Sequence, residues 1–190
     1  MTASKKSLKI NYFLACEGYT EYIIFSYLKN RFRDDFLKSN INFSDKANII
    51  QGGIDIISNG VMDGIGDKAN FKSKYNIIKE KYQGGIFFFL LDDDLDDSSE
   101  IKKIIEKGGD FSQFIKHNSE YLLLRLSGYE LKEPMEFKVS KKFRDYCKEE
   151  FSKKFGKKAS RINDFDLDDI FRDTTDEEIK RIFNDLFSIL

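Results

Sequence analysis

The hydrophobic positions of the chain fall into short apolar segments that alternate with segments of helical spacing. The apolar segments are rich in β-branched and aromatic residues and are bounded by turn residues, which predicts buried β-strands at residues 10–15, 47–50 and 86–91. The other segments repeat apolar residues every three or four positions, which predicts helices from Thr20 onward, over about residues 71–82 and over about residues 98–107. The Thr20 side chain can cap the first of these helices.

This alternation favours an α/β fold with a mostly parallel sheet flanked by helices, because parallel strands are joined by crossover helices. Residues 121–126 are the candidate for a fourth strand. Beyond Pro134, the only proline, the chain changes to charged helical segments. We expect residues 138–190 to form a C-terminal helical extension that packs on a domain covering residues 8–137.

The end of the chain predicts one amphipathic helix. Thr175 and Glu178 have the spacing of a capping box. The apolar face after it is formed by Ile179, Ile182, Phe183, Leu186 and Phe187. We expect this face to pack on the domain.

Length and composition limit the class of protein. A chain of 190 residues with 41% hydrophobic residues suits one folded domain. Its longest apolar run, residues 86–91, is far shorter than the roughly 20 residues that cross a bilayer, and no signal-peptide pattern follows the N-terminal lysines. Cys16 and Cys147 form no CxxC pair, so neither a disulfide framework nor a cysteine zinc site is indicated. We expect a cytoplasmic protein with no membrane partner.

Acidic residues directly follow the first and third predicted strands. Glu17 and Glu21 flank Gly18 after the first strand, and Asp92 and Asp94 follow the third. Ligands gather at the carboxyl ends of parallel strands, so these four carboxylates are expected to converge. Gly18 permits the tight turn that this convergence needs. Carboxylates so close together repel each other unless a cation neutralises them, and oxygen ligands without His or Cys suit Mg²⁺ or Mn²⁺.

A simpler interpretation treats acids after a strand as solvated turns or helix caps. Asp96 and Asp97 fit it, because they precede Ser98 at the start of a predicted helix. Asp92 alone would fit it as well. The order strand, Glu17, glycine and helix, followed later by a strand and an Asp-x-Asp sequence, is what favours a functional site.

The Glu-Gly-Tyr-Thr-Glu sequence at residues 17–21 and the Asp-x-Asp sequence at residues 92–94 resemble the motifs of Toprim (topoisomerase-primase) domains. They are more similar still to the Toprim nucleases of OLD-type, RloB-like and PARIS-system bacterial defence proteins. The resemblance covers residues 8–107 and extends more weakly to about residue 137.

Three further features stand where such domains carry functional positions. Gly52 and Gly53 occupy the place of a glycine turn into a helix, which is also what an ordinary strand-to-helix turn would contain. Glu130 or Glu133 corresponds to an additional glutamate near a strand end, and Lys132 lies between them. A lysine there could offset negative charge on a reacting phosphoryl group.

The resemblance implies a Toprim-like (Rossmann-like) fold and a metal-dependent nuclease that hydrolyses phosphodiester bonds in DNA or RNA, in anti-phage defence. It assigns Glu17, Glu21, Asp92 and Asp94 as ligands of Mg²⁺ or Mn²⁺, with Glu130 as a further catalytic residue. The related systems pair the Toprim unit with an ATPase. An ATPase or sensor partner, or a second copy of the chain, is therefore an open expectation.

Two alternatives differ in class. The first is a non-catalytic Toprim-like module that binds nucleic acid or an ATPase partner. The second is a haloacid-dehalogenase-like phosphatase, which the order of motifs opposes, because its Asp-x-Asp follows the first strand, where this chain has Glu17. The chain has no GxxxxGK[ST] or HExxH sequence, which opposes a P-loop nucleotidase and a zinc protease.

The net charge of −1 hides a segregation of charges. Residues 138–161 carry ten basic and three acidic side chains, whereas residues 164–178 carry eight acidic side chains and one arginine. A basic helix beside a metal site can guide a polyanion, so we expect Lys141, Lys142 and Arg144 to bind nucleic acid. The alternative is an ordinary solvated helix face.

Overall fold

The computed structural model describes residues 10–43, 67–94, 97–137 and 139–190. Within these residues, four strands form one sheet in the order β2 (Ile41–Phe43), β1 (Ile10–Cys16), β3 (Ile86–Asp93) and β4 (Phe111–Lys116). Every neighbouring pair of strands is parallel. The parallel α/β architecture predicted from the sequence is therefore confirmed.

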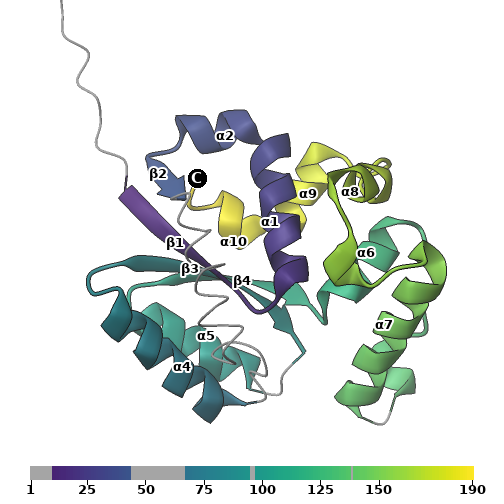
Figure 1. Ribbon diagram of the computed structural model, residues 1–190, viewed down its shortest axis with the longest axis horizontal. Coiled ribbons are helices and arrows are strands. Elements are labelled where there is room, and N and C mark those ends of the chain that lie inside the picture. Colours follow the sequence, from purple (N-terminus) through teal and green to yellow (C-terminus); the bar gives the residue numbers. More distant parts are fainter. Residues whose placement is uncertain (1–9, 44–66, 95–96, 138) are drawn as a thin grey trace, which may run out of the picture.

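Helices cover both faces of the sheet (Figure 1). The α-helices are α1 (Tyr19–Arg31), α2 (Arg33–Lys38), α4 (Lys68–Lys81), α5 (Ser98–Lys107), α6 (Ser119–Leu126), α7 (Ser140–Phe155), α8 (Asp164–Ile170), α9 (Asp176–Ile182) and α10 (Asn184–Phe187). The described residues also form the short 3₁₀ helices η1 (Pro134–Glu136) and η2 (Ala159–Arg161). The three helices predicted from apolar spacing in the first part of the chain correspond to α1, α4 and α5.

Alternating side chains along the strands divide the core into two layers. From β1, Leu14 and Cys16 point to the face covered by α1 and α2, and Ala15 points to the face covered by α4 and α5. The same alternation in β3 places Leu90 in the first layer and Phe89 in the second. The central strands are thus buried on both faces, which explains their continuous apolar sequence.

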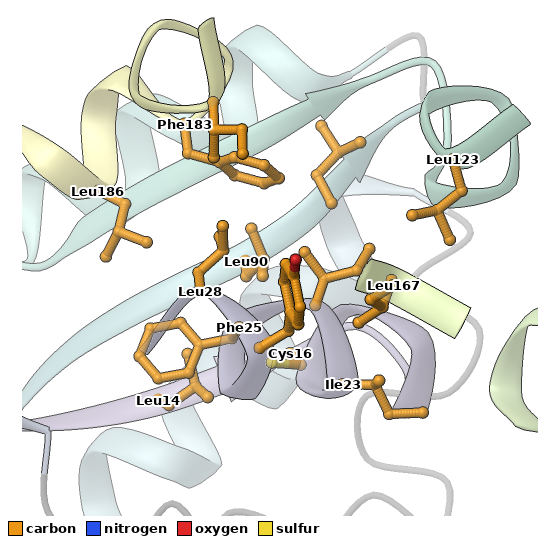
Figure 2. Packing of buried hydrophobic residues seen from close by; sticks show 14 of the residues in the cluster. Leu14, Cys16, Ile23, Phe25, Leu28, Leu90, Leu123, Leu167, Phe183 and Leu186 are labelled. Atoms are coloured by element: carbon orange, nitrogen blue, oxygen red, sulfur yellow. The ribbon is translucent and has the colours of Figure 1, made fainter. Parts of the chain in front are cut away.

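The C-terminal helices complete the first layer. Leu167 of α8, Phe183 between α9 and α10, and Leu186 of α10 are fully buried, in the same cluster as Leu28 and Leu90 (Figure 2). The helical extension therefore shares one hydrophobic core with the sheet. Its apolar side chains face this core, although its sequence is rich in charged residues.

The single amphipathic helix predicted at the end of the chain is two helices, α9 and α10, which meet at Phe183. The side-chain carbonyl of Gln113, on β4, accepts hydrogen bonds from the backbone N–H groups of Asp185 and Leu186, at 3.0 and 3.3 Å. This contact with the sheet satisfies the free amides at the start of α10 and so allows a new helix to begin there.

One of the two predicted helix caps is confirmed and the other is wrong. The hydroxyl of Thr175 accepts a hydrogen bond from the Glu178 N–H, and the Glu178 carboxylate accepts one from the Thr175 N–H at 2.9 Å. Helix α1, in contrast, begins at Tyr19 with Gly18 as its N-cap residue, so Thr20 lies buried inside the helix. The cause is the very short connection between β1 and α1, which starts the helix one residue before the threonine.

Residues 121–126 form part of helix α6 and not a strand. Asn118 caps this helix, because its side-chain oxygen accepts a hydrogen bond from the Tyr121 N–H at 2.7 Å, and Leu123 and Leu124 are buried in the first layer. A short apolar run does not by itself distinguish a strand from a buried helix. The strand of this region is β4, which the sequence analysis did not predict.

Other predictions meet the structure only in part. Strand β2 lies outside the predicted strands, whereas the predicted strand at residues 47–50, Gly52, Gly53 and Asp96 lie outside the described residues. Asp97 occupies the N-cap position of α5, but its side chain makes no capping hydrogen bond and instead accepts one from the Lys68 N–H at 3.3 Å. Across the described ranges, no helix is both long enough and apolar enough to traverse a bilayer.

Candidate acidic site at the carboxyl edge of the sheet

The predicted acidic residues lie where the chain connections of the sheet diverge. From β1 the chain runs to β2 at one edge, and from β3 it runs to β4 at the other edge, so the carboxyl ends of β1 and β3 flank a topological switch point. Such points are where open α/β sheets bind their ligands. Glu17 directly follows β1, whereas Asp92 and Asp93 end β3 and Asp94 comes next.

Backbone pairing brings Glu17 and Asp92 together. The Glu17 N–H donates to the carbonyl of Leu90 at 3.1 Å, and the Asp92 N–H donates to Oε2 of Glu17 at 3.1 Å. The pKa of the Glu17 carboxyl is raised to about 8, chiefly by burial and then by the nearby charges of Glu21 and Asp94. The Asp92 N–H and the positive charge of Arg144 act in the opposite direction.

The hydroxyl of Ser119 joins Glu21 to Asp92. Its Oγ lies 2.6 Å from Oε1 of Glu21 and 2.9 Å from Oδ1 of Asp92. Burial raises the pKa of both carboxyls, and for Asp92 the charges of Glu21 and Glu17 add to the effect. A hydroxyl has only one proton to donate, so one of the two carboxyl groups must itself carry a proton for both hydrogen bonds to form.

Gly18 makes room for Glu21. A Cβ atom at residue 18 would stand 2.9 Å from Oε2 of Glu21. The backbone of Gly18 is extended, with φ −146°, a conformation that any residue adopts. The expectation that glycine is needed there for a tight turn is therefore wrong; the close approach of the Glu21 carboxylate is the physical reason.

Asp94 is paired with a cation from the C-terminal extension. The Arg144 guanidinium on α7 donates to Oδ2 of Asp94 at 3.0 Å. The other carboxylate oxygen, Oδ1, is buried and has no hydrogen-bond partner among the described residues. Arg144, predicted to bind nucleic acid, thus lies at the acidic site, whereas its neighbours Lys141 and Lys142 are exposed near the start of α7.

The fifth acidic residue of the site is Glu120, which sequence analysis missed. Its carboxyl stands in the first turn of α6, with its pKa raised by burial, and the charges of Glu21 and Asp94 also act on it. The positive charge of Lys148 acts in the opposite direction and partly offsets this rise in the pKa of Glu120. Glu120 lies in the first turn of the helix after β4, just as Glu21 lies in the first turn of the helix after β1. The sequence could indicate Glu120 as a site residue only if residues 111–116 were predicted as a strand.

The glutamates proposed from the family resemblance lie elsewhere. Glu130 is exposed, and in the described part of the chain no hydrogen bond or ion pair joins it to the acidic residues above. Glu133 donates its N–H to the carboxylate of Glu136 at 2.8 Å within η1. The ammonium of Lys132 lies over the ring of Tyr146, so Lys132 also makes a contact outside the acidic site. The structure therefore does not bring Glu130 into the acidic site.

The donor chemistry of the site fits a hard divalent cation. The groups that converge are carboxylates and a hydroxyl, which are the oxygen ligands that Mg²⁺ and Mn²⁺ prefer, and the buried oxygen of Asp94 lacks a partner. Over the described ranges, however, no three His, Cys, Asp or Glu side chains already surround one point that could hold an ion. Ser119 and Arg144 hold the carboxylates in their present arrangement.

Comparisons of the chain with models of known families, with curated proteins and with solved structures found no match.

Proposed function

We propose that the chain is a Toprim-like, metal-dependent nuclease that hydrolyses phosphodiester bonds in DNA or RNA. The observation that carries the proposal is the convergence of Glu17, Glu21 and Asp92 at the switch point of the sheet, linked by hydrogen bonds to one backbone amide and one hydroxyl. Asp94 and Glu120 extend this group of acids. A role in anti-phage defence rests only on the sequence motifs.

Glu17, Glu21, Asp92 and Asp94 would hold Mg²⁺ or Mn²⁺. The ion would supply Lewis-acid stabilisation of the developing charge on the phosphoryl group and a lower pKa for the attacking water. The backbone of β3 holds the Glu17 carboxylate in place, because the Asp92 N–H donates a hydrogen bond to it. Ser119 orients the carboxyl groups of Glu21 and Asp92 relative to each other.

The chain also supplies positive charge for the substrate. Arg144 lies against Asp94, and an arginine at this place could exchange its carboxylate partner for phosphate oxygens, which match its planar donor geometry. Lys141 and Lys142 are exposed on the same helix and could bind the backbone of the incoming strand.

The proposal is tested with Glu17→Gln and Asp92→Asn. Each variant removes one ligand charge at nearly constant volume, so cleavage of DNA or RNA with Mg²⁺ or Mn²⁺ should fall about 100-fold or more. Asp93→Asn is the matched control, because Asp93 is exposed next to Asp92. Thermal unfolding verifies that each variant is folded. Wild-type cleavage by either site variant would reject the proposed site.

A second candidate function is a non-catalytic module that binds nucleic acid or an ATPase partner. The ion pair between Arg144 and Asp94 favours it, because part of the acidic charge is neutralised without a metal ion. Assays of binding and of cleavage distinguish the two functions. Nucleic acid or ATPase binding, with no cleavage of any DNA or RNA in either metal, would favour the module over the nuclease.

A further inference from the structure

A cavity adjoins the acidic site on the side of the C-terminal extension. Its volume is about 350 Å³, and it lies between the start of α1, the start of α6, helix α7 and η2. Its polar lining consists of Thr20, Glu120, Lys148, Ser152, Lys158 and Ser160. Two of these residues connect it to the acidic site, because Thr20 precedes Glu21 and Glu120 is itself one of the acids.

The two lysines of this cavity differ from the neighbouring lysines in their contacts within the described part of the chain. Lys153 pairs with Glu150, and Lys157 pairs with Asp166. Lys154 donates to the carbonyl of Ser127 at 3.2 Å. Across the described ranges, Lys148 and Lys158 make no ion pair or hydrogen bond, and both are exposed. Both ammonium groups can therefore reach a ligand, and the charge of Lys148 also acts on the nearby carboxyls of Glu21 and Glu120.

The hydroxyl groups around the cavity complement these charges. Thr20, Ser152 and Ser160 come from three different elements and can each donate a hydrogen bond. Cations combined with hydroxyl donors are the groups that bind phosphate oxygens. Glu120 is the one acid of the lining, and Lys148 opposes its charge.

We propose that this cavity binds a phosphate group of a nucleic-acid strand, through Lys148 and Lys158 and the surrounding hydroxyls. The inference rests on the proposed function in one respect, which is that the strand enters the neighbouring acidic site. The cavity would hold a phosphate beside the one that is cleaved, and so set where the strand lies relative to the acids. Free nucleotides carry the same phosphate chemistry and are distinguished from a strand by experiment.

The test measures binding without metal, so that it does not depend on cleavage. Short single-stranded DNA and RNA oligonucleotides are titrated in EDTA against the wild type and the double variant Lys148→Gln/Lys158→Gln. Loss of the two lysines that bind this phosphate should weaken binding about tenfold or more and reduce the salt slope of log K by about 0.7, the value for one neutralised phosphate of a single strand. The control is Lys103→Gln/Lys107→Gln, which removes the same charge from exposed positions on α5 at the opposite face of the sheet. Thermal unfolding verifies that both double variants are folded.

The outcomes separate this proposal from the proposed function. Equal strand binding by the two double variants would overturn the cavity site, even if cleavage is confirmed. Weakened binding by the cavity variant alone would support it, even if no cleavage is found. In a separate arm, adenosine and thymidine monophosphates are titrated. Lysine-dependent binding of a monophosphate, with unchanged binding of the strands, would overturn the assignment to a strand.

Discussion

The guanidinium of Arg144 donates to the carboxylate of Asp94 at 3.0 Å and thereby joins the C-terminal extension to the end of β3. The two residues are 50 positions apart in the sequence, and the carboxylate is far less exposed than the guanidinium. The basic segment of residues 138–161 therefore contacts the acidic site directly, through the ion pair of Arg144 with Asp94. We therefore expect the site and the extension to respond together to changes in charge.

Replacement of Arg144 tests this coupling. Arg144→Gln leaves Asp94 close to the other acids without its cation, so the free energy of unfolding in EDTA should fall by about 1–3 kcal/mol. Mn²⁺ should then raise the melting temperature of the variant more than that of the wild type. Lys141→Gln, which removes one exposed charge from the same helix, is the control and should change neither quantity. If Mn²⁺ raised the melting temperatures of Arg144→Gln and Lys141→Gln by the same amount, the result would contradict the coupling.

The stability of the metal-free protein should depend on pH through the buried acids. The pKa of Glu17 is raised to about 8 in the folded protein, whereas the unfolded chain titrates near the ordinary value of a glutamate. Between these values the Glu17 carboxyl binds more protons in the folded state than in the unfolded state, so its contribution to stability is fully present below the unfolded pKa and is lost as the pH rises through about 8.

Urea unfolding in EDTA between pH 5 and pH 8.5 measures this loss, which we expect to be on the order of a few kcal/mol. Glu17→Gln should remove a clear part of the pH dependence, because the amide does not titrate. Mg²⁺ or Mn²⁺ should restore stability at high pH if the carboxylates bind it. Stability that increases with pH over this range would contradict the raised pKa values.

Gly18→Ala should disturb the site without harming the fold. The added methyl group would stand 2.9 Å from Oε2 of Glu21, so the carboxylate must shift by a few tenths of an ångström. The backbone at residue 18 is extended and accepts alanine without strain. We expect metal-dependent cleavage to fall about tenfold, since small misplacement of a reacting group is costly, and the melting temperature to stay near that of the wild type. Unchanged cleavage would show that the position of Glu21 is not critical.

Asp110 should matter for stability only. At the end of the sheet opposite the acidic site, its carboxylate accepts hydrogen bonds from the Tyr75 hydroxyl at 2.5 Å and from the Phe87 N–H at 2.9 Å, and it pairs with Lys79. Asp110→Ala leaves the Tyr75 hydroxyl and the Phe87 N–H without this acceptor, and Lys79 keeps only the carbonyl of Gly85, so the free energy of unfolding should fall by about 3–5 kcal/mol. The exposed Glu106→Ala on α5 is the control and should cost far less.

Activity distinguishes this structural role from a functional one. Cleavage per folded molecule of the Asp110 variant, measured well below its melting temperature, should equal that of the wild type. A selective loss of cleavage with normal stability would place Asp110 in the functional machinery.

Local sequence patterns were sufficient for part of the fold and for part of the site. Continuous apolar runs identified β1 and β3, and apolar spacing identified α1, α4 and α5, because burial imposes these periodicities on the sequence itself. The acids after β1 and β3 could likewise be located, since residues after buried parallel strands share one edge of the sheet. Glu120 could not, because the segment before it was not recognised as a strand.

The sequence by itself determined the parallel α/β class, the positions of Glu17, Asp92 and Asp94 at strand ends, and that of Glu21 at the start of the following helix, because strand and helix periodicities are local. Only the tertiary structure decided that Ser119 joins two of these acids and that Arg144 pairs with Asp94, since such contacts depend on how α6 and α7 pack against the sheet. It also decided that Glu120 and not Glu130 lies at the site. The physical reason is that side chains far apart in sequence come within hydrogen-bond distance only after the buried apolar faces have fixed the positions of their helices.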